Sequence, residues 1–134
     1  MTKWQSVWLL VMVAMVGCST NPGGTESAAR KYFHGEFQKW MAGESTAVAT
    51  KRSQRQLLAP PISYDIRSIG RSEPDFLACQ DTANLPADWK TWPAFKLNVA
   101  IEWKSEAGSP MTNVTTYLLT WNSAEQRWYV TEGI

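Results

Sequence analysis

Hydrophobic and polar residues follow three different periods along this chain. An unbroken run of ten apolar residues, from Val7 to Val16, lies close to the start. Between residues 26 and 42 the apolar positions recur every three or four residues, which is typical of one face of an α-helix. From residue 62 onward they recur mostly at every second residue, which is typical of strands with one buried face. The pattern therefore predicts a leader, then helices, then strands.

The helix predicted over residues 26–42 has a single apolar face. Thr25 or Ser27 can cap its start, and Gly43 lies where a helix commonly ends. Because three aromatic side chains share this face, it must pack against a large surface, and a sheet is the obvious candidate. The residues on the face are Ala29, Phe33, Phe37, Trp40 and Met41.

A second, shorter helix is predicted over residues 44–58, which contain good helix formers and neither Pro nor Gly. Pro60 and Pro61 follow and stop any helix. The basic group formed by Lys51, Arg52 and Arg55 is interpreted as a solvated face, because three charges are too few to indicate a lipid or glycan surface.

The second half of the chain begins with alternation of Ile62, Tyr64 and Ile66 with polar residues, which predicts a strand with these three side chains toward the core. A turn is predicted over residues 70–74 and a short strand over residues 75–80.

Three longer strands are predicted to close the chain as a meander. The first spans residues 95–104, in which five large apolar residues alternate strictly with other residues. The second runs back over residues 111–121 with Thr115, Tyr117, Leu119 and Trp121 on one face, and the third spans residues 127–131. Helices that precede strands predict an α+β fold, with the first helix packed across a curved antiparallel sheet.

The start of the chain has the features of a secretory signal. Lys3 precedes the ten-residue apolar run, which is too short to span a membrane but has the length of a signal-peptide core. The run leads into Met15-Val16-Gly17-Cys18. This segment resembles the lipobox of bacterial lipoprotein signal peptides, in which small residues precede an invariant cysteine.

The lipobox resemblance implies that residues 1–17 are removed and that Cys18 carries lipid, including a diacylglycerol on its thiol and fatty acid such as palmitate. Ser19 in the following position implies release to the outer membrane rather than retention in the inner membrane. Residues 18–25 would form a flexible tether, and residues 26–134 a single domain. Two or three acyl chains anchor a protein firmly, whereas one chain binds weakly.

Loss of the leader changes the charge of the chain. The full sequence carries 13 basic and 12 acidic residues, and the loss of Lys3 leaves 12 of each. A formal charge of zero gives no electrostatic basis for binding nucleic acid. The expected contact with the membrane is therefore covalent, through Cys18.

The order of predicted elements also resembles the cone-shaped α+β roll of the cystatin-like and nuclear-transport-factor-like superfamily, over about residues 26–132. The resemblance rests on the aromatic helix that ends at Gly43 and on the long strands that close with Trp128-Tyr129-Val130. It implies a scaffold on which some members catalyse reactions and others bind ligands. The order of predicted elements is also similar to that of small bacterial envelope lipoproteins with the same cone-like shape.

No group of residues in the sequence predicts catalysis, a metal or a cofactor. His34 is the sole histidine and has no ligand-spaced partner, and no nucleophile elbow or glycine-rich phosphate loop is present. Cys79 lies among apolar residues and is interpreted as a small buried group. Asp65 is a general-base candidate only if its side chain points into the cone, and the alternation predicts that it points outward.

The loop predicted over residues 81–93 contains two tryptophans, Trp89 and Trp92. Exposed tryptophans bind sugar rings or partner proteins through their flat apolar faces, whereas buried ones fill the open end of a sheet. The two residues are therefore candidates for contact with an envelope protein or glycan.

Taken together, these features predict a membrane-anchored lipoprotein of the bacterial cell envelope that acts as a non-enzymatic binding or accessory module. Two alternatives remain open at this point. One is an enzyme with Asp65 or His34 in a pocket of the cone, and the other is a structural component of the envelope.

Overall fold

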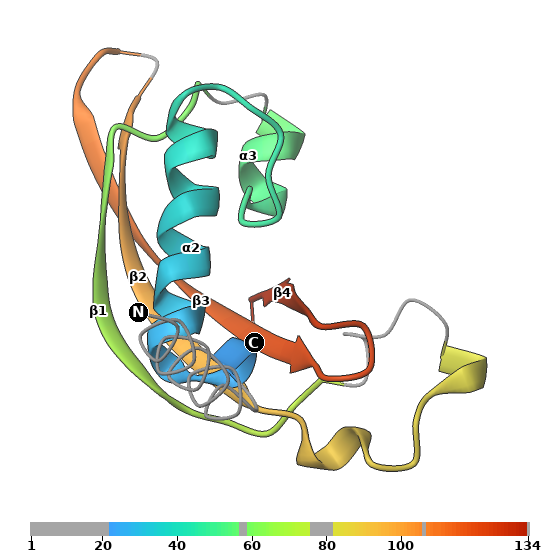
Figure 1. Cartoon of the computed structure of the whole chain (residues 1–134). Coiled ribbons are helices and arrows are strands. Elements are labelled where there is room, and N and C mark those ends of the chain that lie inside the picture. The colour runs from blue at the N-terminus through green and yellow to red at the C-terminus, as the bar shows by residue number, and fades with distance from the viewer. Residues whose placement is uncertain (1–21, 57–58, 76–81, 106, 134) are drawn as a thin grey trace, which may run out of the picture.

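The computed structural model describes residues 22–56, 59–75, 82–105 and 107–133, in which one long helix lies across a four-stranded antiparallel sheet (Figure 1). The strands are adjacent in chain order, so the whole sheet is a meander. The predicted α+β fold is confirmed. The elements are η1 (Pro22–Gly24), α2 (Glu26–Met41), α3 (Lys51–Gln56), β1 (Ser63–Arg71), η3 (Thr82–Asn84), η4 (Trp89–Thr91), β2 (Ala94–Lys104), β3 (Pro110–Asn122) and β4 (Arg127–Glu132).

Helix α2 forms as its sequence predicts at both ends. The Thr25 hydroxyl accepts a hydrogen bond from the backbone N–H of Ala28 at 3.1 Å, and Gly43 adopts a φ of 88° just beyond the last turn. The apolar face is buried except at one predicted position, because Met41 is 36% exposed. Trp40 and Met41 are adjacent and about 100° apart around the helix, so only Trp40 faces the sheet.

The second helix is much shorter than predicted. Helix α3 spans Lys51–Gln56, and residues 44–50 have no helical structure. A long-range contact explains the difference, because the Tyr117 hydroxyl donates a hydrogen bond to the carbonyl of Val48 at 2.8 Å. The Thr50 hydroxyl then caps α3 by accepting from the backbone N–H of Ser53 at 3.1 Å. Residues 57–58 lie outside the described residues.

Strand β1 is longer than predicted and its apolar face is shifted. It continues through Gly70, which pairs with Lys96 of β2, so the predicted turn begins only after Arg71. A register irregularity lies between Ile66 and Ser68. Ile62 precedes the strand and is 40% exposed, which contradicts its predicted place in the core. The predicted strand at 75–80 lies, apart from its first residue, outside the described residues.

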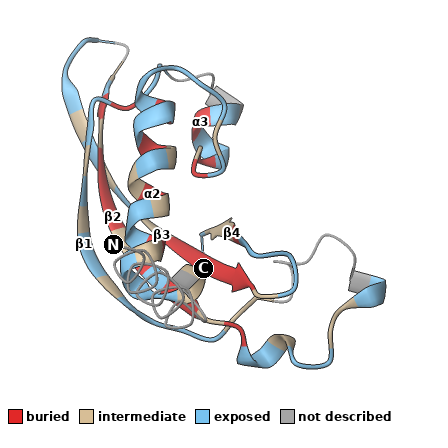
Figure 2. Cartoon of the chain, viewed as in Figure 1, coloured by how far each residue is buried: buried red, intermediate tan, exposed pale blue. Residues whose placement is uncertain are grey.

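The core lies between α2 and the inner face of the sheet, where Figure 2 shows buried residues along β2 and β3. The Phe37 ring stacks on Tyr64, with 4.0 Å between ring centroids. The Phe33 ring meets Tyr117 edge-on at 5.2 Å. Edge-on and offset contacts of this kind add about 0.5–1.5 kcal/mol to the free energy of burial. The interior of the curved sheet is therefore filled by aromatic side chains.

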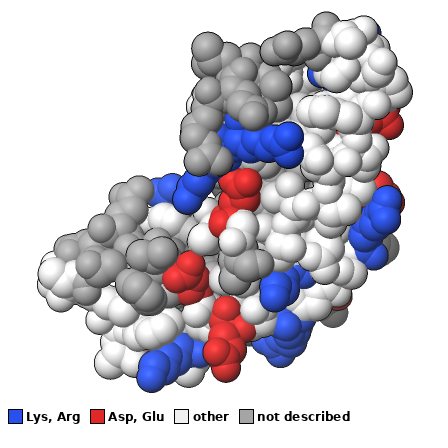
Figure 3. Space-filling view, turned by 180° about the vertical axis from the view of Figure 1, so that it is seen from behind, with Lys and Arg blue, Asp and Glu red and all other residues white. Residues whose placement is uncertain are grey.

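The outer face of the sheet is polar. Asn98 of β2 donates a hydrogen bond to the Ser68 hydroxyl and accepts one from the Thr116 hydroxyl, each at 2.8 Å, so one ladder crosses three strands. Asp65 is exposed on this face, as the alternation predicts. Viewed from behind, basic and acidic side chains are interspersed without a large patch of one sign (Figure 3).

Replacement of Phe37 tests the role of the aromatic core. Because its ring is fully buried against Tyr64 and Trp40, we expect Phe37→Ala to lower the free energy of unfolding by about 3–5 kcal/mol in urea denaturation. Met41→Ala on the same helix is the matched control, with an expected change within about 0.5 kcal/mol. Equal losses in the two variants would contradict this assignment of the core.

Candidate functional site

The first candidate site is a hollow of about 190 Å³ between α3 and the inner face of β3, which we call the α3 notch. It forms because β3 extends beyond β4: β4 ends opposite Tyr117, whereas β3 begins at Pro110. The α3 notch is lined by Thr50, Arg52, Trp103, Asn113, Val114, Thr115 and Glu132.

Two hydrogen bonds fix the segment that borders the α3 notch. The Tyr117 hydroxyl holds the carbonyl of Val48, and the Glu132 carboxylate accepts from the backbone N–H of Lys51 at 2.9 Å. Glu132 is the last residue of β4, and Lys51 is the first residue of α3. The start of α3 is therefore attached to the end of β4, and this attachment lies beside the α3 notch.

The α3 notch combines both signs of charge with neutral hydrogen-bonding groups. Arg52 and Glu132 contribute the charges, and the side chains of Asn113 and Thr115 occupy inward positions of β3. Trp103 is 4% exposed, and its Nε1–H is buried with no hydrogen-bond partner among the described residues. A buried donor without an acceptor costs about 1–3 kcal/mol of folding free energy.

Burial raises the pKa of the Tyr117 phenol well above its ordinary value of 10.0, and the nearby Glu132 carboxylate raises it further. Both effects disfavour the phenolate, because a charge would be desolvated and would lie near another negative charge. The phenol therefore remains a donor to Val48 throughout the neutral and moderately alkaline range.

The second candidate site is a hollow of about 280 Å³ lined by Glu73, Pro74, Trp89 and Lys90, which we call the Trp89 cleft. The short helix η4 positions its aromatic wall, since the backbone N–H of Trp92 donates to the carbonyl of Trp89 at 3.1 Å. The Lys90 ammonium lies 6.0 Å from the centroid of the Trp89 ring. An indole face beside an ammonium and a carboxylate suits a ligand with apolar and polar parts.

The structure separates the two tryptophans predicted as contacts. Trp89 is half-buried and lines the Trp89 cleft, whereas Trp92 is 3% exposed and lies inside the domain. Of the two tryptophans, only Trp89 is therefore placed to contact a partner.

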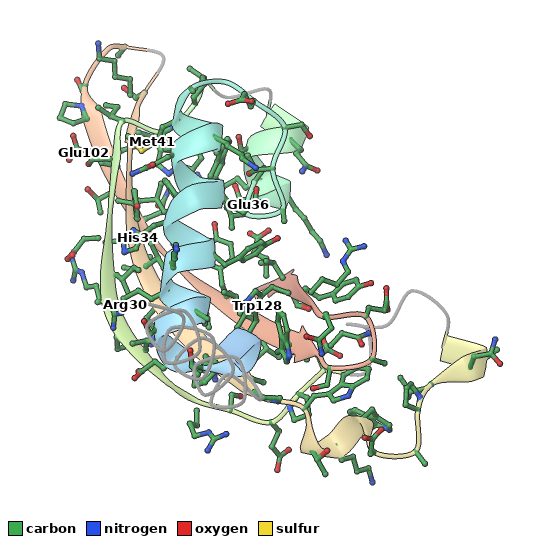
Figure 4. All side chains as sticks on the ribbon, viewed as in Figure 1. Arg30, His34, Glu36, Met41, Glu102 and Trp128 are labelled. Atoms are coloured by element: carbon green, nitrogen blue, oxygen red, sulfur yellow. The ribbon has the colours of Figure 1, made fainter. Side chains whose placement is uncertain are left out.

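The predicted titratable candidates do not come together. The His34 Nδ1 forms a short hydrogen bond with the Tyr64 hydroxyl on the helix-covered side of β1, whereas Asp65 is exposed on the outer face. Figure 4 shows His34 on the side of α2 toward β1 and Glu36 on the opposite side. Cys18 and Cys79 lie outside the described residues.

In the part of the chain that the structure describes, no group of three or more His, Cys, Asp or Glu residues could hold a metal ion. None of the helices in this part is long and apolar enough to cross a membrane.

Sequence reasoning missed the α3 notch, although one signal for it is visible. Asn113 and Thr115 are polar at positions that alternate with the core residues Tyr117 and Leu119, so the inner face of β3 becomes polar toward its start. Such a change from apolar to polar residues indicates where a helix no longer packs over the inner face of the strand. Arg52 and Glu132 carry no comparable signal, because only the fold brings their segments together.

Comparisons with protein-family models, curated protein sequences and solved structures find no match to this chain.

Replacement of Tyr117 tests how the α3 notch is held. We expect Tyr117→Phe to lower the free energy of unfolding at pH 7 by about 1 kcal/mol, because the hydrogen bond to Val48 is lost while the ring packing remains. The folded-state pKa is raised above 10.0, so the stability linked to this phenol is present below pH 10 and is lost as the pH rises further.

The measurement is urea denaturation at several pH values. Above pH 10 the wild type should lose about 1.4 kcal/mol per pH unit more than the variant, so that the two stabilities converge. A constant difference between them from pH 7 to pH 11 would contradict the role assigned to the phenol.

Proposed function

We propose that this protein is a lipid-anchored, non-enzymatic binding module of the bacterial cell envelope, attached to a membrane through Cys18. The basic residue, ten-residue apolar run and Met-Val-Gly-Cys sequence at the start of the chain support the anchor. The Ser at position 19 supports the outer membrane as its destination.

The α3 notch supports binding as the activity of the folded domain. Arg52 and Glu132 line the same hollow and can pair with a ligand that carries a carboxylate and an ammonium group. The Trp103 side chain adds an aromatic wall to this hollow. A volume of about 190 Å³ limits the ligand to a small molecule. We therefore propose a small zwitterion, of the size of a free amino acid, as the ligand.

The packing of the interior favours binding at the rim over catalysis inside the cone. Phe33 and Phe37 are fully buried between α2 and the sheet, where they fill the space that an internal substrate pocket would need. Asp65 lies on the outer face, away from that interior. These observations weigh against the alternative of a pocket enzyme.

Replacement of Cys18 tests the anchor. We expect Cys18→Ala to move the protein from the membrane fraction to the soluble fraction of a bacterial host, and the purified variant to lack the mass of the acyl chains. Cys79→Ala is the matched control and should leave both readouts unchanged. Retention of Cys18→Ala in the membrane at an unmodified mass would show that no lipid on Cys18 is needed.

Thermal stabilisation by added ligand tests whether the α3 notch binds a small zwitterion. We expect the full-length protein to unfold at a higher temperature in the presence of at least one member of a panel of free amino acids, because a ligand at 100 times its Kd stabilises by about 2.7 kcal/mol. Glu132→Gln keeps an acceptor for Lys51 while it removes the charge, and should abolish the shift.

Two further variants make the ligand test specific. Arg52→Gln should also abolish the shift, whereas Lys96→Gln, on the exposed outer face of β2, should preserve it. A panel without effect, or a shift that survives in both notch variants, would show that the α3 notch does not bind zwitterions.

A further inference from the structure

We propose that Trp89 and Lys90 contact the surface of the membrane to which Cys18 is attached, so that the domain is held in a fixed orientation. This inference rests on the lipid anchor proposed above. It is carried by the place where the N-terminal segment meets the domain, by its distance along the chain from Cys18 and by the chemistry of the η4 loop.

The N-terminal segment packs tightly against one end of the sheet. A Cβ atom added at Gly23 would overlap the indole of Trp121, and one added at Gly24 would lie 2.8 Å from Cγ of Pro93. Only glycine allows so close an approach. The chain is therefore pressed against the domain at Pro93 and Trp121 directly before α2 begins.

The η4 loop lies at the same end of the sheet. The carbonyl of Pro93 accepts a hydrogen bond from the backbone N–H of Trp121 at 2.8 Å, and Pro93 follows η4 (Trp89–Thr91) by only two residues. Figure 1 shows this loop and the start of α2 toward one end of the molecule, with α3 and the β2–β3 hairpin toward the other. Pro22, where the described chain begins, and the η4 loop thus lie toward one end of the molecule, and the α3 notch lies toward the other.

The chain between Cys18 and Pro22 is too short to hold this end far from a bilayer. Four residue steps span at most about 14 Å, even when fully extended. The interfacial region of a bilayer occupies several ångströms on each side of the hydrocarbon core. A lipid on Cys18 therefore brings the Pro93 end of the domain next to the headgroups, whatever the path of the intervening residues.

The side chains of the η4 loop suit this location. Tryptophan prefers the boundary between hydrocarbon and water, and lysine extends its ammonium toward headgroup phosphates. Trp89 is half-buried and Lys90 exposed, with the ammonium 6.0 Å from the indole centroid. Leu85 and Pro86 add half-buried apolar surface shortly before them. The two groups can thus reach interfacial and headgroup depth together.

The anchor makes even a weak contact effective. A group that a covalent anchor keeps near a surface meets that surface as an intramolecular partner, so one tryptophan and one lysine suffice where a free protein would need many contacts. An envelope glycan could use the same indole face, but only the lipid surface is brought to this end of the domain by the anchor on Cys18. These observations therefore favour the lipid surface.

Quenching of tryptophan emission by brominated phospholipid tests the contact. The lipidated full-length protein is reconstituted into vesicles of phosphatidylethanolamine and phosphatidylglycerol, with and without bromine on the acyl chains. The other five tryptophans of the segment after Cys18 are at most 7% exposed. We expect quenching equivalent to about one tryptophan in six in the wild type, its loss in Trp89→Phe, and a reduction in Lys90→Gln.

The outcomes separate this inference from the proposed function. If mass analysis shows no lipid on Cys18, both proposals are wrong. If the lipid is present but the wild type and Trp89→Phe are quenched equally, only the membrane contact is wrong. If Trp89 emission responds to soluble peptidoglycan fragments and not to brominated lipid, the Trp89 cleft binds glycan and the membrane contact is again wrong. Lys96→Gln, on the outer face, should behave as the wild type.

Discussion

Two phenylalanines on one face of α2 hold this domain together. Phe33 contacts both Tyr64 on β1 and Tyr117 on β3, with ring centroids 6.1 and 5.2 Å apart, and Phe37 stacks on Tyr64. A helix of 16 residues has little stability in water by itself, so α2 depends on this burial. The sheet depends on it as well, because its inner face would otherwise expose a continuous apolar surface.

The same packing extends to the rim through Tyr117. Its ring belongs to the core against Phe33, while its hydroxyl holds the backbone of Val48 and so places the start of α3. The attachment of Lys51 to Glu132 completes the arrangement. The geometry of the α3 notch is therefore set by the core rather than by loops that could move independently of it.

The sequence predicted those features that depend on local period and missed those that depend on distant partners. The apolar face of α2, apart from Met41, and the alternation in β2 follow from residues a few positions apart, and both are confirmed. The short length of α3 depends on Tyr117, which lies 69 residues from Val48, and the extension of β1 through Gly70 depends on pairing with β2. No period in the sequence carries such information.

The candidate sites show the same limit. The tryptophans of the η4 loop were recognisable as candidates, but a single helical turn decides that Trp92 is buried while Trp89 lines a surface hollow. The α3 notch joins residues near positions 50, 114 and 132, so its charges could be assembled only from the fold. Its neutral part was visible as the change from apolar to polar along β3.

The difference in length between β3 and β4 has a consequence for self-association. Unpaired backbone groups along a strand edge are a template for pairing with another molecule, which leads to aggregates. Among the described residues, β4 leaves the first half of β3 without a partner on that side, and α3 borders this edge with exposed Lys51 and Arg52. The opposite edge, β1, carries a register irregularity and the exposed charges Asp65, Arg67 and Arg71. The two borders of the sheet thus each carry features that oppose edge-to-edge pairing with another molecule.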